Sequence, residues 1–66
     1  MNNSSHWQIG LAEAERVFED ELYARSWLET PNAALGELTP RSLLDSAAGL
    51  TQVLRVLASI EHGLPL

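Results

Sequence analysis

Apolar residues recur at helical spacing through the first half of the chain. Successive members lie mostly three or four residues apart, and they are Leu11, Ala14, Phe18, Leu22, Ala24, Trp27 and Leu28. This period predicts helix over residues 10–29, with one side buried. The pattern fits either one bent helix or two helices joined near Glu19 and Asp20. We favour two helices, because an aspartate at position 20 can cap the start of a second one.

A loop and a further helix follow. Pro31 ends the preceding helix, because the residue before a proline avoids the helical region, and Gly36 permits a turn that other residues disfavour. We therefore expect a structured loop over residues 30–38, with one turn at Ala33 and Ala34. Thr39 and Pro40 are a strong helix start, and the pattern predicts that this helix ends at Gly49 with a left-handed cap.

The last predicted helix, residues 50–62, is the most amphipathic segment. Its apolar positions fill one broad arc, and they are Leu50, Val53, Leu54, Val56, Leu57 and Ile60. Glu61 falls inside this arc, about 20° from Leu50 on a helical wheel, and its charge sits at the helix end where the dipole disfavours anions. Gly63 should end the helix, and a short apolar tail of Leu64, Pro65 and Leu66 follows.

These elements predict an all-α fold: a small single domain, residues 1–66, of three to four short helices. We expect residues 1–8 to be frayed and no helix-turn-helix DNA-binding domain to be present. One shared core should contain Leu22, Trp27, Leu28, Leu43, Leu44, Val53, Leu57 and Ile60. A chain of this size has a marginal core, so tight binding to a partner would be unsurprising.

Composition narrows the function classes. The 66 residues carry a net charge of −5, with four arginines, no lysine and no cysteine, and all of the acidic excess lies in residues 1–38. Without a basic face the chain is not expected to bind nucleic acid directly. It has no apolar run long enough for a membrane span and no signal-peptide pattern, so we expect no membrane association. The lack of cysteine is compatible with a reducing cytoplasm, where we place the protein.

The sequence offers no catalytic constellation. It has no phosphate-binding glycine loop and no nucleophile motif, and its glycines are expected at helix ends or turns. His6 and His62 lie near opposite termini without the carboxylates of a metal site. We therefore expect no enzyme activity, no cofactor and no metal.

The order of these residues resembles a known family. A W-L-x-x-P-N-x-x-L-G run at residues 27–36, a T-P-x-x-L-L-x-x-x-x-G run at residues 39–49, and then Val53, Leu57, Ile60 and Gly63 are similar to the toxin-binding domain of the Xre/MbcA/ParS antitoxins. The resemblance covers about residues 14–63. Glu19 and Glu37 stand where the family often has glycine.

The resemblance implies an antitoxin of a type II toxin-antitoxin system. Its usual partner is a RES-domain toxin that degrades NAD, neutralised by a protein contact over the active-site cleft, in a possible toxin-antitoxin hetero-oligomer. The alternative is a non-enzymatic helical regulatory domain that self-associates into a homo-oligomer through the apolar arc of the last helix.

We expect the toxin to contact the polar edge of the last helix and the tail. The candidate residues are Arg55, Ser59, Glu61, His62, Gly63, Leu64, Pro65 and Leu66. The carboxylate after Leu66 is an anion of the kind that a pyrophosphate-binding cleft would accept. The alternative for the two tail leucines is that they fold back on the domain's own core.

Overall fold

The computed structural model describes residues 4–63 and is built from helices. Helix α1 spans Ser4–Phe18 and α2 spans Glu21–Leu28, so the predicted break into two helices is confirmed. Glu19 makes the turn with a left-handed backbone, φ 56°. Asp20 then caps α2, since its side chain accepts a hydrogen bond of 2.9 Å from the backbone N–H of Tyr23.

The loop after α2 contains the expected turn as a short 3-10 helix, η1, at Ala33–Leu35. Asn32 caps η1 through a 2.9 Å hydrogen bond from the N–H of Ala34 to Oδ1, and an isolated antiparallel bridge joins Asn32 to Leu38. Gly36 has φ 67°, which confirms the predicted left-handed turn. Loop residues 31–38 are therefore held by their own backbone hydrogen bonds.

Two helices complete the described part of the chain: α3, Pro40–Leu43, and α4, Ala47–His62. Thr39 caps α3 as predicted, but α3 does not continue to Gly49. Ser46 caps a new helix instead, accepting a 3.0 Å hydrogen bond from the N–H of Gly49, so the predicted left-handed stop at this glycine is wrong. Gly63 does end α4 with a left-handed backbone, φ 67°.

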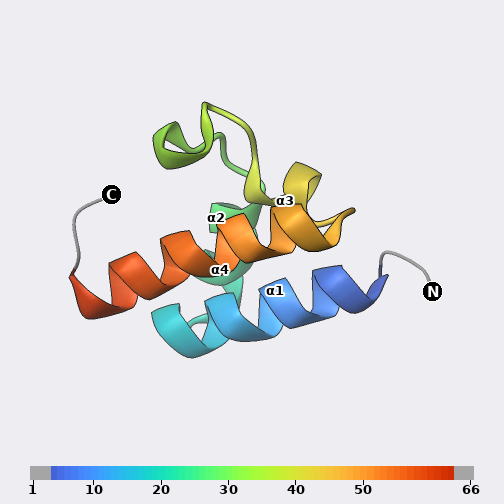
Figure 1. Cartoon of the computed structure of the whole chain (residues 1–66). Helices are drawn as coiled ribbons and strands as arrows, with labels where there is room; N and C mark the ends of the chain where they lie inside the picture. The colour runs from blue at the N-terminus through green and yellow to red at the C-terminus, as the bar shows by residue number, and fades with distance from the viewer. Residues whose placement is uncertain (1–3, 64–66) are drawn as a thin grey trace.

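Figure 1 shows α1 and α4 side by side and running in the same direction, with α2 behind them. Both helices therefore bring their C-terminal ends to the same end of the domain. The segment from α2 to α3 is the crossover that makes this parallel arrangement possible. Over residues 4–63, no helix combines the length and the hydrophobicity that a membrane span requires.

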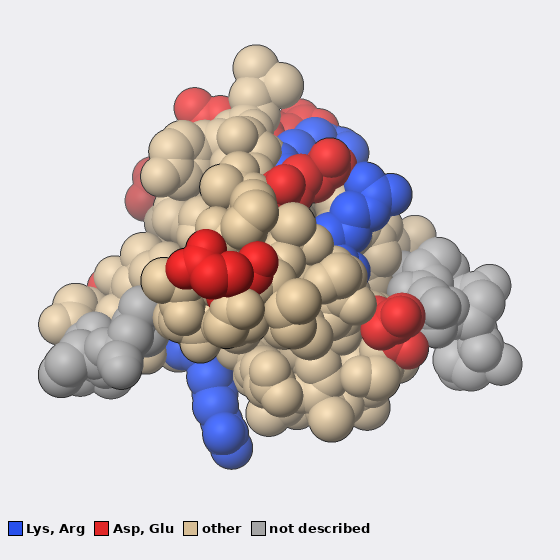
Figure 2. Space-filling model, turned by 90° about the horizontal axis from the view of Figure 1, so that it is seen from above, with Lys and Arg blue, Asp and Glu red and all other residues tan. Residues whose placement is uncertain are grey.

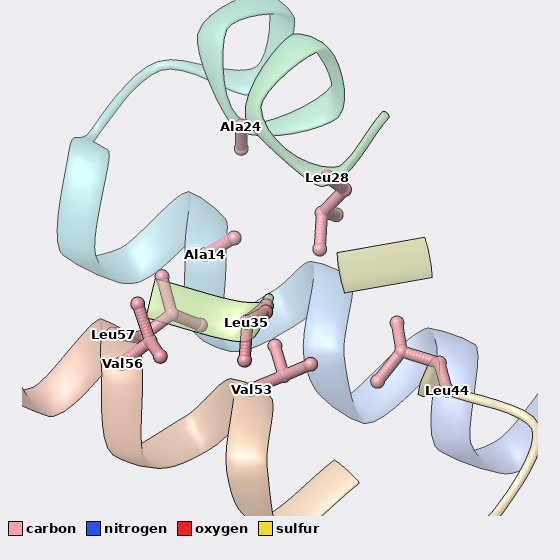
Figure 3. Packing of buried hydrophobic residues seen from close by; sticks show 8 residues of the cluster. All are labelled: Ala14, Ala24, Leu28, Leu35, Leu44, Val53, Val56 and Leu57. Atoms are coloured by element: carbon pink, nitrogen blue, oxygen red, sulfur yellow. The ribbon is translucent and has the colours of Figure 1, made fainter. Parts of the chain in front are cut away.

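The core draws on every part of this arrangement (Figure 3). Its buried apolar residues are Ala14, Ala24, Leu28, Leu35, Leu44, Val53, Val56 and Leu57. Trp27 and Leu43, which we expected in the core, are half-buried and pack against it. The all-α fold of short helices is confirmed over the described residues.

Two predicted core residues are not in the core. Leu22 is 80% exposed, because it lies two residues before Ala24 and so points to the opposite side of α2. Ile60 is 39% exposed, because it lies almost one turn beyond Leu57, the last buried residue of α4.

Residues 4–8, for which we expected fraying, are helical, and residues 1–3 lie outside the described part of the chain. Trp7 is half-buried and packs against the core, and the Arg41 guanidinium lies 4.9 Å from its ring centroid. Arg41 also pairs with Glu29 at 2.8 Å, so one side chain connects α3 to α1 and to the end of α2. These contacts explain why the helix begins so early.

Candidate functional site

The outer face of α4 carries the polar residues predicted from its helical pattern. Arg55 is exposed and Ser59, four residues later, is partly exposed on the same face. The opposite face carries Val53, Val56 and Leu57, which are buried against the rest of the domain. Burial of one side of α4 thus fixes which side of the helix, with Arg55 and Ser59, faces the solvent.

Arg55 differs from the other three arginines. Arg25 pairs with Glu21 within α2, Arg41 pairs with Glu29, and Arg16 pairs with two carboxylates. Among the ion pairs of residues 4–63, none involves Arg55. Figure 2 shows one face of the molecule, on which red and blue side chains adjoin one another in one area while most of the surface is tan. Arg55 therefore carries a positive charge on α4 that no carboxylate of the described residues pairs with.

Glu61, the residue at odds with the apolar arc, is paired with Arg16 at the C-terminal end of α1. The guanidinium donates two hydrogen bonds to it, from Nη1 to Oε2 at 2.7 Å and from Nη2 to Oε1 at 2.8 Å. Arg16 also donates to Glu13 from Nε, at 3.2 Å, and from Nη2. This pairing accounts for an acidic residue on the side of α4 that faces α1.

The electrostatics of this cluster follow from the hydrogen bonds. Donation by Arg16 holds the pKa of the Glu61 and Glu13 carboxyl groups below their usual value, against a smaller opposing effect of desolvation. The two carboxylates in turn raise the pKa of Arg16. All three groups are therefore charged at neutral pH.

The C-terminal end of α4 is exposed to solvent. His62 is exposed, and its Nε2 lies 3.8 Å from Oε1 of Glu61, while Gly63 turns the chain out of the helix. The structure thus places Arg55, Ser59, Glu61 and His62 on the C-terminal half of α4 and Gly63 directly after it, although Glu61 lies on the side facing α1. The other three predicted contact residues, Leu64, Pro65 and Leu66, lie outside the described residues.

We searched residues 4–63 for a metal site and for a surface pocket. No group of three His, Asp or Glu side chains in this range is placed to hold a metal ion. An open hollow on α2 is lined by the exposed residues Arg25, Ser26, Glu29 and Thr30, none of which belongs to the predicted contact set.

Residues 13–63 match the family described as the antitoxin Xre/MbcA/ParS C-terminal toxin-binding domain. The chain belongs to this family. The toxin-binding domain is also similar to Antitoxin Xre of Photorhabdus laumondii subsp. laumondii, with 38% identity over 45 residues, or 68% of this chain. That match spans only 30% of the relative's length. No solved structure shows a significant match.

The sequence analysis did not predict that Arg16 pairs with Glu13 and Glu61 in this region of the toxin-binding domain. Two signals pointed to these pairs: the spacing of three residues between Glu13 and Arg16 on a helix, which allows an ion pair, and the unexplained acid at position 61. The pairing itself joins residues 45 positions apart, and it depends on the parallel arrangement of α1 and α4.

Proposed function

We propose that this chain acts in the cytoplasm as the toxin-binding part of an antitoxin. Its partner is a RES-domain toxin that degrades NAD, which it neutralises by direct contact over the active-site cleft. The observation that carries the assignment is the family match over residues 13–63, which includes α2, α3 and α4. The RES partner and the NAD chemistry come from the resemblance of the motif residues and are the finer part of the proposal.

The proposed contact surface is the C-terminal half of α4 with the tail that follows it. Arg55 supports this choice because it is exposed and has no carboxylate partner among the described residues. Ser59, His62 and Gly63 adjoin it along the helix. The buried helices act as support that holds this surface in one shape.

The tail supplies the inhibitory element of this proposal. Leu64 would fill the mouth of the NAD-binding cleft, and Pro65 limits the conformations that the tail loses on binding. Toxin loaded with a non-hydrolysable NAD analogue should therefore bind the chain more weakly. Simultaneous binding without mutual penalty would show that inhibition does not occur by occlusion.

The self-association alternative loses its main support in the structure. It required the apolar arc of α4 to be free, but Val53, Val56 and Leu57 are buried inside the domain. Leu50 and Leu54 are half-buried, and Ile60 is the one exposed residue of the arc. Toxin binding through the polar face of α4 does not require the apolar residues of the arc to be exposed.

Co-purification tests the proposal directly. The proposal predicts a RES-domain protein encoded beside the gene of this chain. The chain is expressed with an affinity tag together with that untagged protein, and the two should elute as one complex. Arg55→Glu should reduce recovery of the partner. Arg25→Glu, which changes an exposed arginine on another helix, is the matched control and should leave recovery unchanged. A RES-domain neighbour that is produced but never retained would contradict the proposed partner.

A further inference from the structure

The last turn of α4 has few contacts that hold it to the domain. Leu57 is the last buried residue of the helix, and Ile60, Glu61 and His62 are all exposed. Carbonyl groups in the final turn of a helix also lack helical partners, so such ends open easily. The side of the last turn that faces α1 nevertheless has one well-defined attachment, the ion pair between Glu61 and Arg16.

The geometry of this attachment is unusually complete for a surface pair. Nη1 and Nη2 of Arg16 meet the two oxygens of Glu61 at 2.7 and 2.8 Å, which is the bidentate arrangement. Nε, with a further bond from Nη2, meets Glu13 on the same helix. Because Glu13 holds the guanidinium from one side, less conformational freedom is lost when Glu61 binds the other.

The parallel direction of α1 and α4 makes the ion pair between Arg16 and Glu61 more favourable. Figure 1 shows the C-terminal ends of α1 and α4 at the same end of the domain. Each helix places partial negative charge there, and Glu61 adds a full one. Arg16, in the last turn of α1, supplies a permanent positive charge that offsets these charges, and His62 lies beside Glu61 in the last turn of α4. Without Arg16, the acid at position 61 would destabilise the turn that carries it.

We propose that Arg16 is a positioning residue for toxin binding. It holds the last turn of α4 in helical form through Glu61, and so it fixes Ser59, His62 and Gly63 relative to Arg55. Glu61 then acts mainly through its bond to Arg16 rather than through a contact with the toxin. This role deepens the proposed function and rests on it, because a fixed last turn matters only if that turn meets a partner.

Amide hydrogen exchange of the free chain tests the first half of this role without any toxin. In Arg16→Met, the backbone amides of residues 60–62 should exchange about fivefold faster than in the unmodified chain. The amides of residues 53–57 should not change. Arg25→Met removes a comparably exposed arginine that pairs only within α2, and it should leave both sets unchanged. Equal exchange at residues 60–62 with and without Arg16, or acceleration of both sets alike, would overturn a local positioning role.

A charge swap tests the second half, with the co-purifying RES-domain protein as the probe. Arg16→Glu and Glu61→Arg should each weaken binding about fivefold or more. The double variant should return to within about twofold of the unmodified chain, since Glu13 remains as a further partner for the introduced guanidinium. If Glu61 contacts the toxin directly, the double variant stays as weak as Glu61→Arg, which overturns the proposal. If the unmodified chain does not bind the toxin, the proposed function fails, whereas the exchange experiment still decides whether Arg16 holds the turn.

Discussion

The β-carbon that Gly49 lacks would lie 1.8 Å from the carbonyl oxygen of Leu43. This close approach lets the first turn of α4 pack against the end of α3. Since the neighbouring atoms are backbone, no side-chain rotation can relieve the overlap. Gly49→Ala should therefore lower the free energy of unfolding by about 2–3 kcal/mol or more, measured by urea denaturation.

Comparison with Gly36→Ala separates two reasons why a position requires glycine, namely steric overlap of a β-carbon and a left-handed backbone. Gly36 has φ 67° with nothing within 4 Å of an added β-carbon, so only backbone strain opposes alanine there. That strain should lower the free energy of unfolding by about 1 kcal/mol. Equal losses at Gly36 and Gly49 would contradict the backbone overlap at Gly49.

Leu28 and Leu22 give a second test, within a single helix. Leu28 is fully buried, and Leu28→Ala should lower the free energy of unfolding by about 2–5 kcal/mol, a large share of the stability of a domain this small. Leu22 is 80% exposed, so Leu22→Ala should change it by less than about 0.5 kcal/mol. Similar losses for the two variants would show that α2 is rotated relative to the described packing.

Glu19 and Glu37 are the non-glycine residues with left-handed backbones in the described part of the chain, at φ 56° and 68°. A side chain in this region costs about 1 kcal/mol or more, which glycine avoids, although glycine loses more entropy on folding. We expect Glu19→Gly and Glu37→Gly to leave the free energy of unfolding unchanged or raise it by up to about 1 kcal/mol. Glu15→Gly, inside α1, should lower it by about 1 kcal/mol. A loss of that size at position 19 or 37 would contradict the strain.

The Arg16 cluster predicts a particular pH dependence. Hydrogen bonds from Arg16, aided at Glu61 by the charge of His62, lower the pKa of Glu13 and Glu61 below the usual 4.5. Their stabilising contribution is therefore complete above about pH 4.5 and lost as the pH falls through the folded values. The melting temperature of the unmodified chain should fall more steeply between about pH 5 and about pH 3 than that of Arg16→Met. If the melting temperatures of the two proteins fall in parallel with pH, the ion pairs of Arg16 with Glu13 and Glu61 do not stabilise the fold.

Local signals in the sequence were sufficient for most helix ends. Asp20 and Thr39 cap helices as their side chains predict, Gly36 adopts the left-handed turn expected of it, and Gly63 ends α4 as expected. Each of these features depends on a few neighbouring residues, so a single sequence contains the information. Ser46 was a signal of the same kind, and reading it would have placed the start of α4 correctly.

Features that depend on tertiary contacts were not predictable in this way. Gly10 and Gly49 lie inside helices, where a β-carbon would press on Leu44 at 2.9 Å and on Leu43. Helical periodicity placed Glu61 among apolar positions but gave no partner for it. Its partner is Arg16, which reaches it only because α1 and α4 run in parallel.

The central claim is that the outer face of α4 binds the toxin, and a binding titration tests it most directly. The chain is titrated into the proposed RES-domain toxin, with Arg55→Glu and Arg25→Glu as a matched pair of exposed charge reversals. The account predicts that Arg55→Glu weakens binding about tenfold or more, while Arg25→Glu stays within about twofold of the unmodified chain. Equal affinities for the two variants would contradict it.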